Sequence, residues 1–219
     1  MNTANITIDG RRIKAIKGEI LLYRALAEGF FIPNLCAMEE VHPPSASCRL
    51  CWVAVEGAAK PMTSCTVRIE DGMTVRTRGE AVDRLVRAGF EMLMSAHRLD
   101  CKICPGNRRC ALQTIAKERG LSLRPKRFDK IEPEWPIDES RPEMGFNPNH
   151  CVLCGRCVYV CNHVVKRGVL DFTRRGLLTA VGTFDGEPLA RQDCDGCLAC
   201  VEVCPVVALY LRGQVADNH

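Results

Sequence analysis

The chain has 219 residues, of which 47% are hydrophobic, a composition typical of a globular protein that excludes a largely disordered one. Its formal charge of +4 at pH 7 treats 15 cysteines as neutral, so it is weak support for a nucleic-acid partner. No apolar run approaches the ~20 residues of a membrane-spanning helix, and residues 1–5 do not begin a signal peptide. We therefore expect a cytoplasmic protein without direct membrane insertion, whose cysteines bind metal rather than form disulfides.

Residues 1–78 are predicted to form a small β-rich domain. Short apolar segments on either side of Asp9-Gly10 indicate a β-hairpin. Residues 19–29 have apolar side chains at helical spacing and end at Gly29, a suitable C-terminal cap. A proline-containing loop follows. Further short strands are predicted at 52–55, 64–69 and 73–77.

Four cysteines of this domain follow the pattern C-x11-C-x2-C-x13-C: Cys36, Cys48, Cys51 and Cys65. The first three lie on or beside the loop, where backbone N–H groups can point at cluster sulfurs and stabilise their charge. A four-thiolate zinc site is the alternative, but zinc ribbons usually use two C-x2-C pairs, and this pattern has one. The spacing therefore favours a [2Fe–2S] cluster.

Residues 79–120 are predicted to form a helical module. Apolar residues recur at helical spacing from Val82 to Met94, and this helix is expected to end near His97. A second helix is expected over 113–119, with Gly120 as its cap. Between the helices lies the pattern H-x3-C-x2-C-x5-C, formed by His97, Cys101, Cys104 and Cys110. Taken alone, this pattern suits either a zinc site with three thiolates and one imidazole or an iron–sulfur cluster.

Residues 121–148 contain five prolines among charges of both signs, so we expect an extended, solvated linker rather than a nucleic-acid patch. Residues 149–219 carry the pattern C-x2-C-x2-C-x3-C twice, and Pro205 follows the second copy. This double spacing suits two [4Fe–4S] clusters, in which the fourth cysteine of each run ligates the other cluster. The predicted ligand sets are Cys151, Cys154, Cys157 and Cys204 for one cluster, and Cys161, Cys194, Cys197 and Cys200 for the other. The long gap between the two runs predicts an inserted hairpin around Arg174-Arg175-Gly176.

Residues 6–36 and the segment Ser47 to Gly57 resemble the N-terminal iron–sulfur region of the large subunit of NADH dehydrogenase. The same region occurs in [FeFe]-hydrogenases, NAD-dependent formate dehydrogenases and diaphorase subunits of NAD-reducing hydrogenases. The His97 motif and the Arg-Gly hairpin extend the resemblance along the chain. One position departs from the family, because Ala46 stands where members usually carry glycine two residues before the C-x2-C pair.

The resemblance implies an α+β fold with three cluster-binding parts. They are a β-grasp, ferredoxin-like [2Fe–2S] domain at 1–78, a [4Fe–4S] module with one histidine and three cysteine ligands at 79–120, and a bacterial two-[4Fe–4S] ferredoxin-like domain at 149–219. Iron would thus be bound as one [2Fe–2S] and three [4Fe–4S] clusters. His150 and His163 flank the first cysteine run, and we expect them to form hydrogen bonds or to be exposed rather than to ligate iron.

Fifteen cysteines and one histidine fill these four clusters without remainder, so no catalytic residue is expected. The resemblance implies an electron-relay subunit of an NAD(P)-linked oxidoreductase complex. Its partners would be a flavin- and NAD(P)-binding iron–sulfur subunit and a separate catalytic subunit, such as a formate dehydrogenase or hydrogenase. We expect that separation because the residues after Leu211 cannot hold the catalytic domain of longer relatives. A free multi-cluster ferredoxin and a zinc-binding structural protein are the alternatives.

Overall fold

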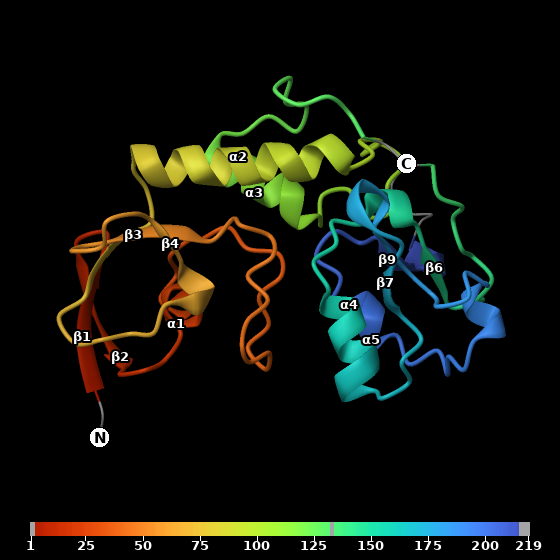
Figure 1. The fold of residues 1–219 in the computed structure, drawn as a ribbon, viewed down its shortest axis with the longest axis horizontal. Coiled ribbons are helices and arrows are strands. Elements are labelled where there is room, and N and C mark those ends of the chain that lie inside the picture. Colours follow the sequence, from red (N-terminus) through yellow and green to blue (C-terminus); the bar gives the residue numbers. More distant parts are fainter. Residues whose placement is uncertain (1–2, 132–133, 215–219) are drawn as a thin grey trace. The chain divides into compact units, whose positions relative to one another are not determined.

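The computed structural model describes residues 3–131 and 134–214, which fold into a mixture of helices and strands (Figure 1). The chain divides into two compact units, Met1–Glu91 and Met92–His219. None of the helices in the described part of the chain has the length and hydropathy of a membrane-spanning helix.

The N-terminal unit contains one five-stranded sheet in the order β2-β1-β5-β3-β4. Its strands are β1 (Thr3–Ile8), β2 (Arg11–Ile16), β3 (Trp52–Val55), β4 (Met62–Thr63) and β5 (Thr74–Arg76). Strands β1 and β5 run parallel, and the other neighbours are antiparallel. The predicted hairpin is confirmed, because β1 and β2 pair around Asp9 and Gly10, whose φ angles of 48° and 83° form the turn.

Helix α1 (Leu21–Ala27) supplies the other half of this unit's core. Its Leu21, Leu22 and Ala25 are buried in one cluster with the inward side chains of β1. The helix ends before Gly29, which has a φ of 82°, as the sequence predicts. Burial of apolar side chains from both elements stabilises this unit as an ordinary hydrophobic core.

The prediction of a continuous strand over 64–69 is wrong. Residues Ser64–Thr66 form a 3₁₀ turn, η1, and Arg68 alone bridges to Ile20. Both the backbone N–H and the hydroxyl of Ser64 donate to the carbonyl of Cys51, at 2.8 and 2.9 Å. These bonds turn the chain so that the next residue, Cys65, is buried.

Helix α2 (Glu80–Ala96) follows the sheet and ends directly before His97, as predicted. Val82, Val86, Phe90 and Met94 are buried and lie four residues apart, so they form one apolar face. Glu80 and Asp83 lie in the first turn, where negative charge stabilises the helix. Gly89 leaves room for a close approach, since a Cβ at this position would lie 2.7 Å from the carbonyl oxygen of Arg49.

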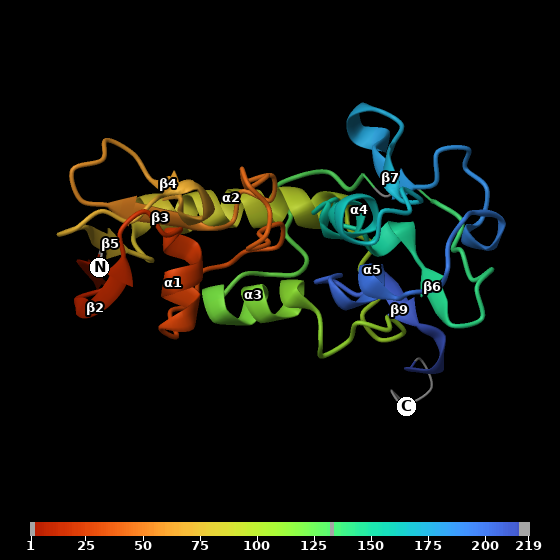
Figure 2. The ribbon, with the colours of Figure 1, turned by 90° about the horizontal axis from the view of Figure 1, so that it is seen from below.

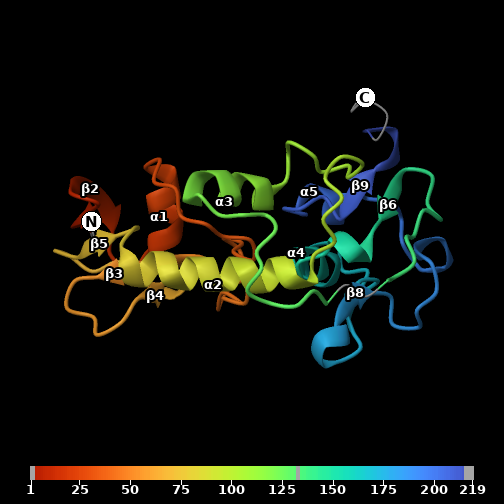
Figure 3. The same ribbon diagram turned by 90° about the horizontal axis from the view of Figure 1, so that it is seen from above.

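The C-terminal unit is built from short elements. Helix α3 (Ala111–Arg119) ends at Gly120, whose φ is 63°, as predicted. Strands β6 (Met144–Phe146) and β9 (Leu209–Leu211) pair antiparallel and lie side by side (Figure 3). The helical turns of this unit are η2 (Pro148–His150), α4 (Arg156–Tyr159), the π-helical η3 (Val160–Val164), η4 (Gly176–Leu178), η5 (Leu189–Arg191), α5 (Ala199–Glu202) and η6 (Arg212–Gln214).

The predicted inserted hairpin is formed by β7 (Asp171–Thr173) and β8 (Ala180–Gly182). It stands away from the rest of its unit in Figure 2. Residues 121–148, predicted as an extended and solvated linker, are not extended and solvated throughout. Residues Met144–Phe146 of this segment form the buried strand β6. None of the five prolines falls within 144–146, so these three residues can join a sheet.

Candidate metal centres

The structure brings the four cysteines of the N-terminal unit together as two buried pairs. Cys36, Cys48, Cys51 and Cys65 are each at most 7% exposed. The thiol of Cys48 hydrogen-bonds to Cys36 and lowers the pKa of Cys36 to about 4, and the thiol of Cys65 acts likewise on Cys51, whose pKa falls to about 7. The same contacts raise the pKa of Cys48 and Cys65, so each pair favours one thiolate and one thiol. Four buried sulfurs in two such pairs suit a metal centre that would replace the remaining protons.

The loop carrying Cys48 and Cys51 is held in an unusual backbone conformation. Ala46 and Arg49 have φ angles of 47° and 53°, which turn the chain around the sulfurs. The backbone N–H of Cys48 lies 3.5 Å from the sulfur of Cys36, as expected where amides stabilise cluster charge. The indole N–H of Trp52 donates to the carbonyl of Arg49 at 2.7 Å, and the Arg49 guanidinium stacks on the same ring at 4.6 Å. These two contacts between Trp52 and Arg49 were not predicted from the sequence.

The second predicted set lines one small cavity of the C-terminal unit. His97, Cys101, Cys104 and Cys110 lie around it together with Gly106 and Val206. The His97 ring is buried, and within the described residues its Nδ1 has no hydrogen-bond partner. Burial, with the nearby His150 and Lys130, lowers the pKa of His97 to about 4, so the ring is neutral at pH 7. A neutral imidazole with a free ring nitrogen fits a metal ligand.

In each C-terminal run the fourth cysteine lies near the other run. Cys161 lines an apolar cavity with Cys194, Cys197 and Cys200 of the later run. Cys204 lies near the first run, because it raises the pKa of both Cys151 and Cys157 in addition to the larger effect of burial. Cys200 of the later run acts on Cys157 as well. The cavity thus brings Cys161 to the later run, and Cys204 lies near the first run, an arrangement compatible with the predicted crossed ligand sets.

The two runs also share a backbone pattern that the sequence did not reveal. Leu153 and Gly155 in the first run have φ angles of 53° and 78°, and the equivalent Gly196 and Leu198 have 69° and 62°. The N–H of Leu153 points at the sulfur of Cys151 at 3.4 Å. Leucine rarely adopts positive φ, so the repeat of this conformation indicates that the loops are shaped around their sulfurs.

The two groups differ in exposure. Cys157 is buried in the first group, whereas Cys197 is exposed in the second. Arg167 lies beside the second group and forms ion pairs with Asp193 and Asp195 at 3.2 and 3.3 Å. A centre at the second group would therefore lie nearer to the surface of this unit than one at the first.

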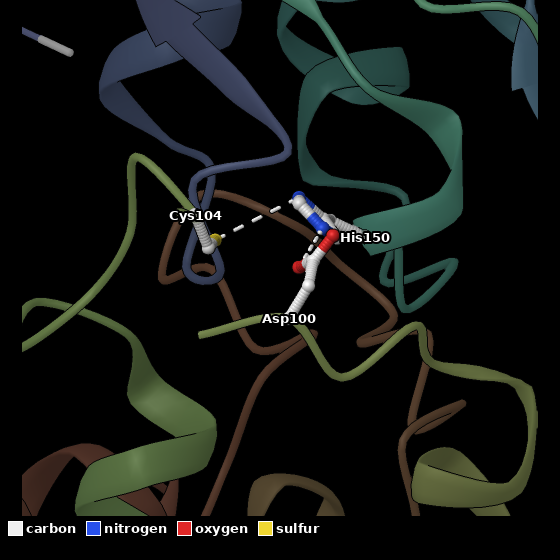
Figure 4. A group of neighbouring side chains, drawn as sticks. All are labelled: Asp100, Cys104 and His150. Atoms are coloured by element: carbon white, nitrogen blue, oxygen red, sulfur yellow. Dashed lines mark hydrogen bonds and ion pairs between the residues drawn. The ribbon is translucent and has the colours of Figure 1, made fainter. Parts of the chain in front are cut away.

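One further cluster of side chains lies beside the predicted ligand set of His97, Cys101, Cys104 and Cys110. Asp100, Cys104 and His150 offer ligand atoms that all lie within 4.8 Å of one another (Figure 4). His150 is buried and hydrogen-bonded, which agrees with its expected role, but Asp100 was not identified from the sequence. No local signal distinguishes Asp100, because its partner lies 50 residues away.

Three family descriptions match parts of the chain. Residues 2–80 match the 2Fe-2S iron-sulfur cluster binding domain. Residues 87–124 match the NADH-ubiquinone oxidoreductase-G iron-sulfur binding region, and residues 191–210 match the 4Fe-4S binding domain. The chain thus carries both a 2Fe–2S domain and 4Fe–4S domains.

The relatives are subunits of redox enzymes. NADPH-Fe(3+) oxidoreductase subunit alpha of Geobacter sulfurreducens is 35% identical over 214 residues, which are 95% of this chain and 24% of the relative. A subunit of the NADH-quinone oxidoreductase of Rhizobium meliloti is 35% identical over 206 residues, or 93% of this chain and 23% of the relative. The chain therefore spans about a quarter of the length of these relatives. The crystal structure of an NAD+-reducing [NiFe]-hydrogenase in the H2-reduced state contains a chain that is 29% identical, with a TM-score of 0.78, and the match covers 95% of this chain and 87% of that one.

Proposed function

Since the chain carries 2Fe–2S and 4Fe–4S domains and its homologues are subunits of NAD(P)-linked oxidoreductases and hydrogenases, we propose that it relays electrons within a complex of this kind. The relay would use one [2Fe–2S] and three [4Fe–4S] clusters. Such clusters exchange single electrons when protein side chains occupy all their ligand positions.

The predicted ligand sets support this proposal. They divide the 15 cysteines and His97 into four sets of four, and the members of each set belong to one compact unit. The group at Cys36 would hold the [2Fe–2S] cluster in a ferredoxin-like domain. The groups at His97, Cys151 and Cys194 would each hold a [4Fe–4S] cluster, the last two in a ferredoxin-like domain of bacterial type. The module boundaries predicted from the sequence, at 78, 120 and 148, form part of the same proposal.

The partners would lie at the two ends of the relay. A flavin-containing subunit that binds NAD(P) would exchange electrons at one end, and a catalytic subunit for formate, hydrogen or another two-electron donor at the other. The names of the relatives support NAD(P) and hydrogen, and formate rests on the sequence resemblance alone. We propose a cytoplasmic location because dense cysteine with metal chemistry is typical of a reducing compartment.

Metal analysis of the purified chain tests the proposal. We expect iron and acid-labile sulfide in the amounts that one [2Fe–2S] and three [4Fe–4S] clusters require, and reduced-state electron paramagnetic resonance (EPR) spectra with separate [2Fe–2S] and [4Fe–4S] signals. Near-stoichiometric zinc without visible absorbance would refute the relay and favour a zinc protein.

A free multi-cluster ferredoxin is the second candidate, and the exposed Cys197 favours it because an exposed cluster can meet a soluble partner. Isolation from native extract separates the two functions. A relay subunit should co-purify with a flavoprotein, whereas a free carrier should be isolated alone.

A further inference from the structure

We propose that His150, held by Asp100, is a positioning residue that donates a hydrogen bond to the Cys104 sulfur and thereby raises the reduction potential of the cluster at His97. This inference rests on the proposed function, because it requires a [4Fe–4S] cluster on His97, Cys101, Cys104 and Cys110. It adds two side chains, Asp100 and His150, to the four that would bind iron.

The geometry fixes the His150 ring between two acceptors. The ring is 2% exposed, and its Nε2 lies 2.6 Å from the Asp100 carboxylate. Its Nδ1 faces the sulfur of Cys104 at 3.7 Å, within the range of hydrogen bonds to sulfur (Figure 4). A buried ring held at both nitrogens cannot turn without breaking one of these contacts.

The chemistry of the ligand sets the direction of the second bond. A cysteine that binds iron does so as a thiolate, so its sulfur carries no proton and can only accept. The Asp100 carboxylate is likewise an acceptor. Of the two groups at this contact only the imidazole can supply a proton to the sulfur, so in the proposed arrangement Nδ1 donates to Cys104 while Nε2 faces the Asp100 carboxylate.

Asp100 is itself anchored to the segment that carries His150. The Arg98 guanidinium lies 3.7 Å from the Asp100 carboxylate, and the N–H of Arg98 donates to the carbonyl of Asn149 at 3.1 Å. Arg98 thus links Asp100 to Asn149, the residue before His150. These contacts hold the His150 ring close to the Cys104 sulfur.

His150 also contacts the imidazole ligand of the same cluster. The His97 and His150 ring centres lie 5.8 Å apart, and the His150 backbone hydrogen-bonds to the His97 ring. A backbone partner of this kind orients a metal-binding histidine. One residue therefore supports two of the four ligands, Cys104 through its side chain and His97 through its backbone.

The expected consequence is a change in potential rather than a loss of iron. A hydrogen bond to a ligand sulfur stabilises the reduced cluster more than the oxidised one, because reduction adds negative charge at the sulfurs. Removing the donor should lower the midpoint potential of the His97 cluster. The backbone contact to His97 would survive a side-chain substitution, so the cluster should still assemble.

The test uses the full chain with its clusters and compares three variants by EPR-monitored redox titration. His150→Leu removes the donor, Asp100→Asn removes the carboxylate that orients it, and His150→Asn keeps an N–H near the former Nδ1. His163→Leu is the matched control, because His163 is an exposed histidine of the same unit. Iron and sulfide content is measured for every sample.

We expect His150→Leu to lower the potential of the His97 cluster and to change its EPR spectrum, with a smaller shift for Asp100→Asn. His150→Asn should recover part of the loss, and His163→Leu should match the wild type at this cluster. An unchanged potential in fully loaded His150→Leu protein would overturn the inference. So would loss of this cluster from all three variants, since that result indicates a purely structural role. Absence of the cluster from the wild type would instead refute the proposed function.

Discussion

Replacing Gly89 by alanine tests whether helix α2 supports the loop that carries Cys48 and Cys51. The added Cβ would lie 2.7 Å from the carbonyl oxygen of Arg49 and 3.4 Å from a methyl group of Leu50. The first contact is shorter than carbon and oxygen tolerate, and it involves backbone that cannot rotate away. Arg49 already has a φ of 53° and lies between the two cysteines, so any relief moves the loop.

Two opposing effects set the magnitude. Alanine is a better helix former than glycine by about 1 kcal/mol. Overpacking against a fixed neighbour costs about 1–3 kcal/mol. We expect the clash to prevail, so that Gly89→Ala destabilises the N-terminal unit by up to about 2 kcal/mol, a factor of about 30 in its unfolding equilibrium.

The assay follows the visible circular dichroism expected of the [2Fe–2S] cluster during urea unfolding of the full chain. Gly182→Ala is the control, because its Cβ would meet Thr173 at an ordinary 3.6 Å. We expect Gly89→Ala to lose the signal at lower urea than the wild type, and Gly182→Ala to match it. A Gly89→Ala protein more stable by about 1 kcal/mol would show that helix propensity alone acts and would refute the close approach.

Three further predictions concern the C-terminal unit. Cys161→Ser should alter the EPR signal of the cluster at Cys194 and spare that at Cys151, while Cys204→Ser should do the reverse; the opposite pairing would disprove crossed ligation. Asn149→Ala removes two hydrogen bonds of 2.8 Å to the backbone of Trp135, which should cost about 2–3 kcal/mol, and trypsin should then cut 124–141 faster; equal cleavage rates would contradict this role. Removal of iron should reduce hydrogen-exchange protection in 151–208 more than in β1 and β5, because the proposed ligands are closely spaced in 151–208 whereas the inward side chains of β1 and β5 are buried in one apolar cluster; equal losses in both regions would contradict this.

The sequence was most informative where metal ligation fixes the spacing of cysteines or a turn requires a particular residue type. Cys161 and Cys204 were assigned across the two runs from their order alone. Cys161 lines one cavity with Cys194, Cys197 and Cys200, and the assignment of the iron ligands stays a prediction. The hairpin at Asp9-Gly10 and the helix end at Gly29 were predictable for the same reason, since few residues adopt positive φ.

Contacts between distant residues could not be predicted in this way. The turn at Ser64 depends on the carbonyl of Cys51, and the three residues of β6 become a strand only when β9 pairs with them. Likewise, Asp100 gains its significance from His150, which is 50 residues away. Local periodicity contains no information about such partners.

The proposed crossed ligation, with Cys161 and Cys204 each binding the cluster of the other run, would link the two halves of the C-terminal unit through iron. With the proposed ligand sets, each cluster is bound by residues from both sides of the β7–β8 hairpin. A protease cut at the exposed tip of this hairpin, near Arg175, would leave two pieces that eight iron–sulfur bonds still fasten together. The pieces should therefore migrate as one body until the iron is removed, so the clusters would act as reversible cross-links of the polypeptide.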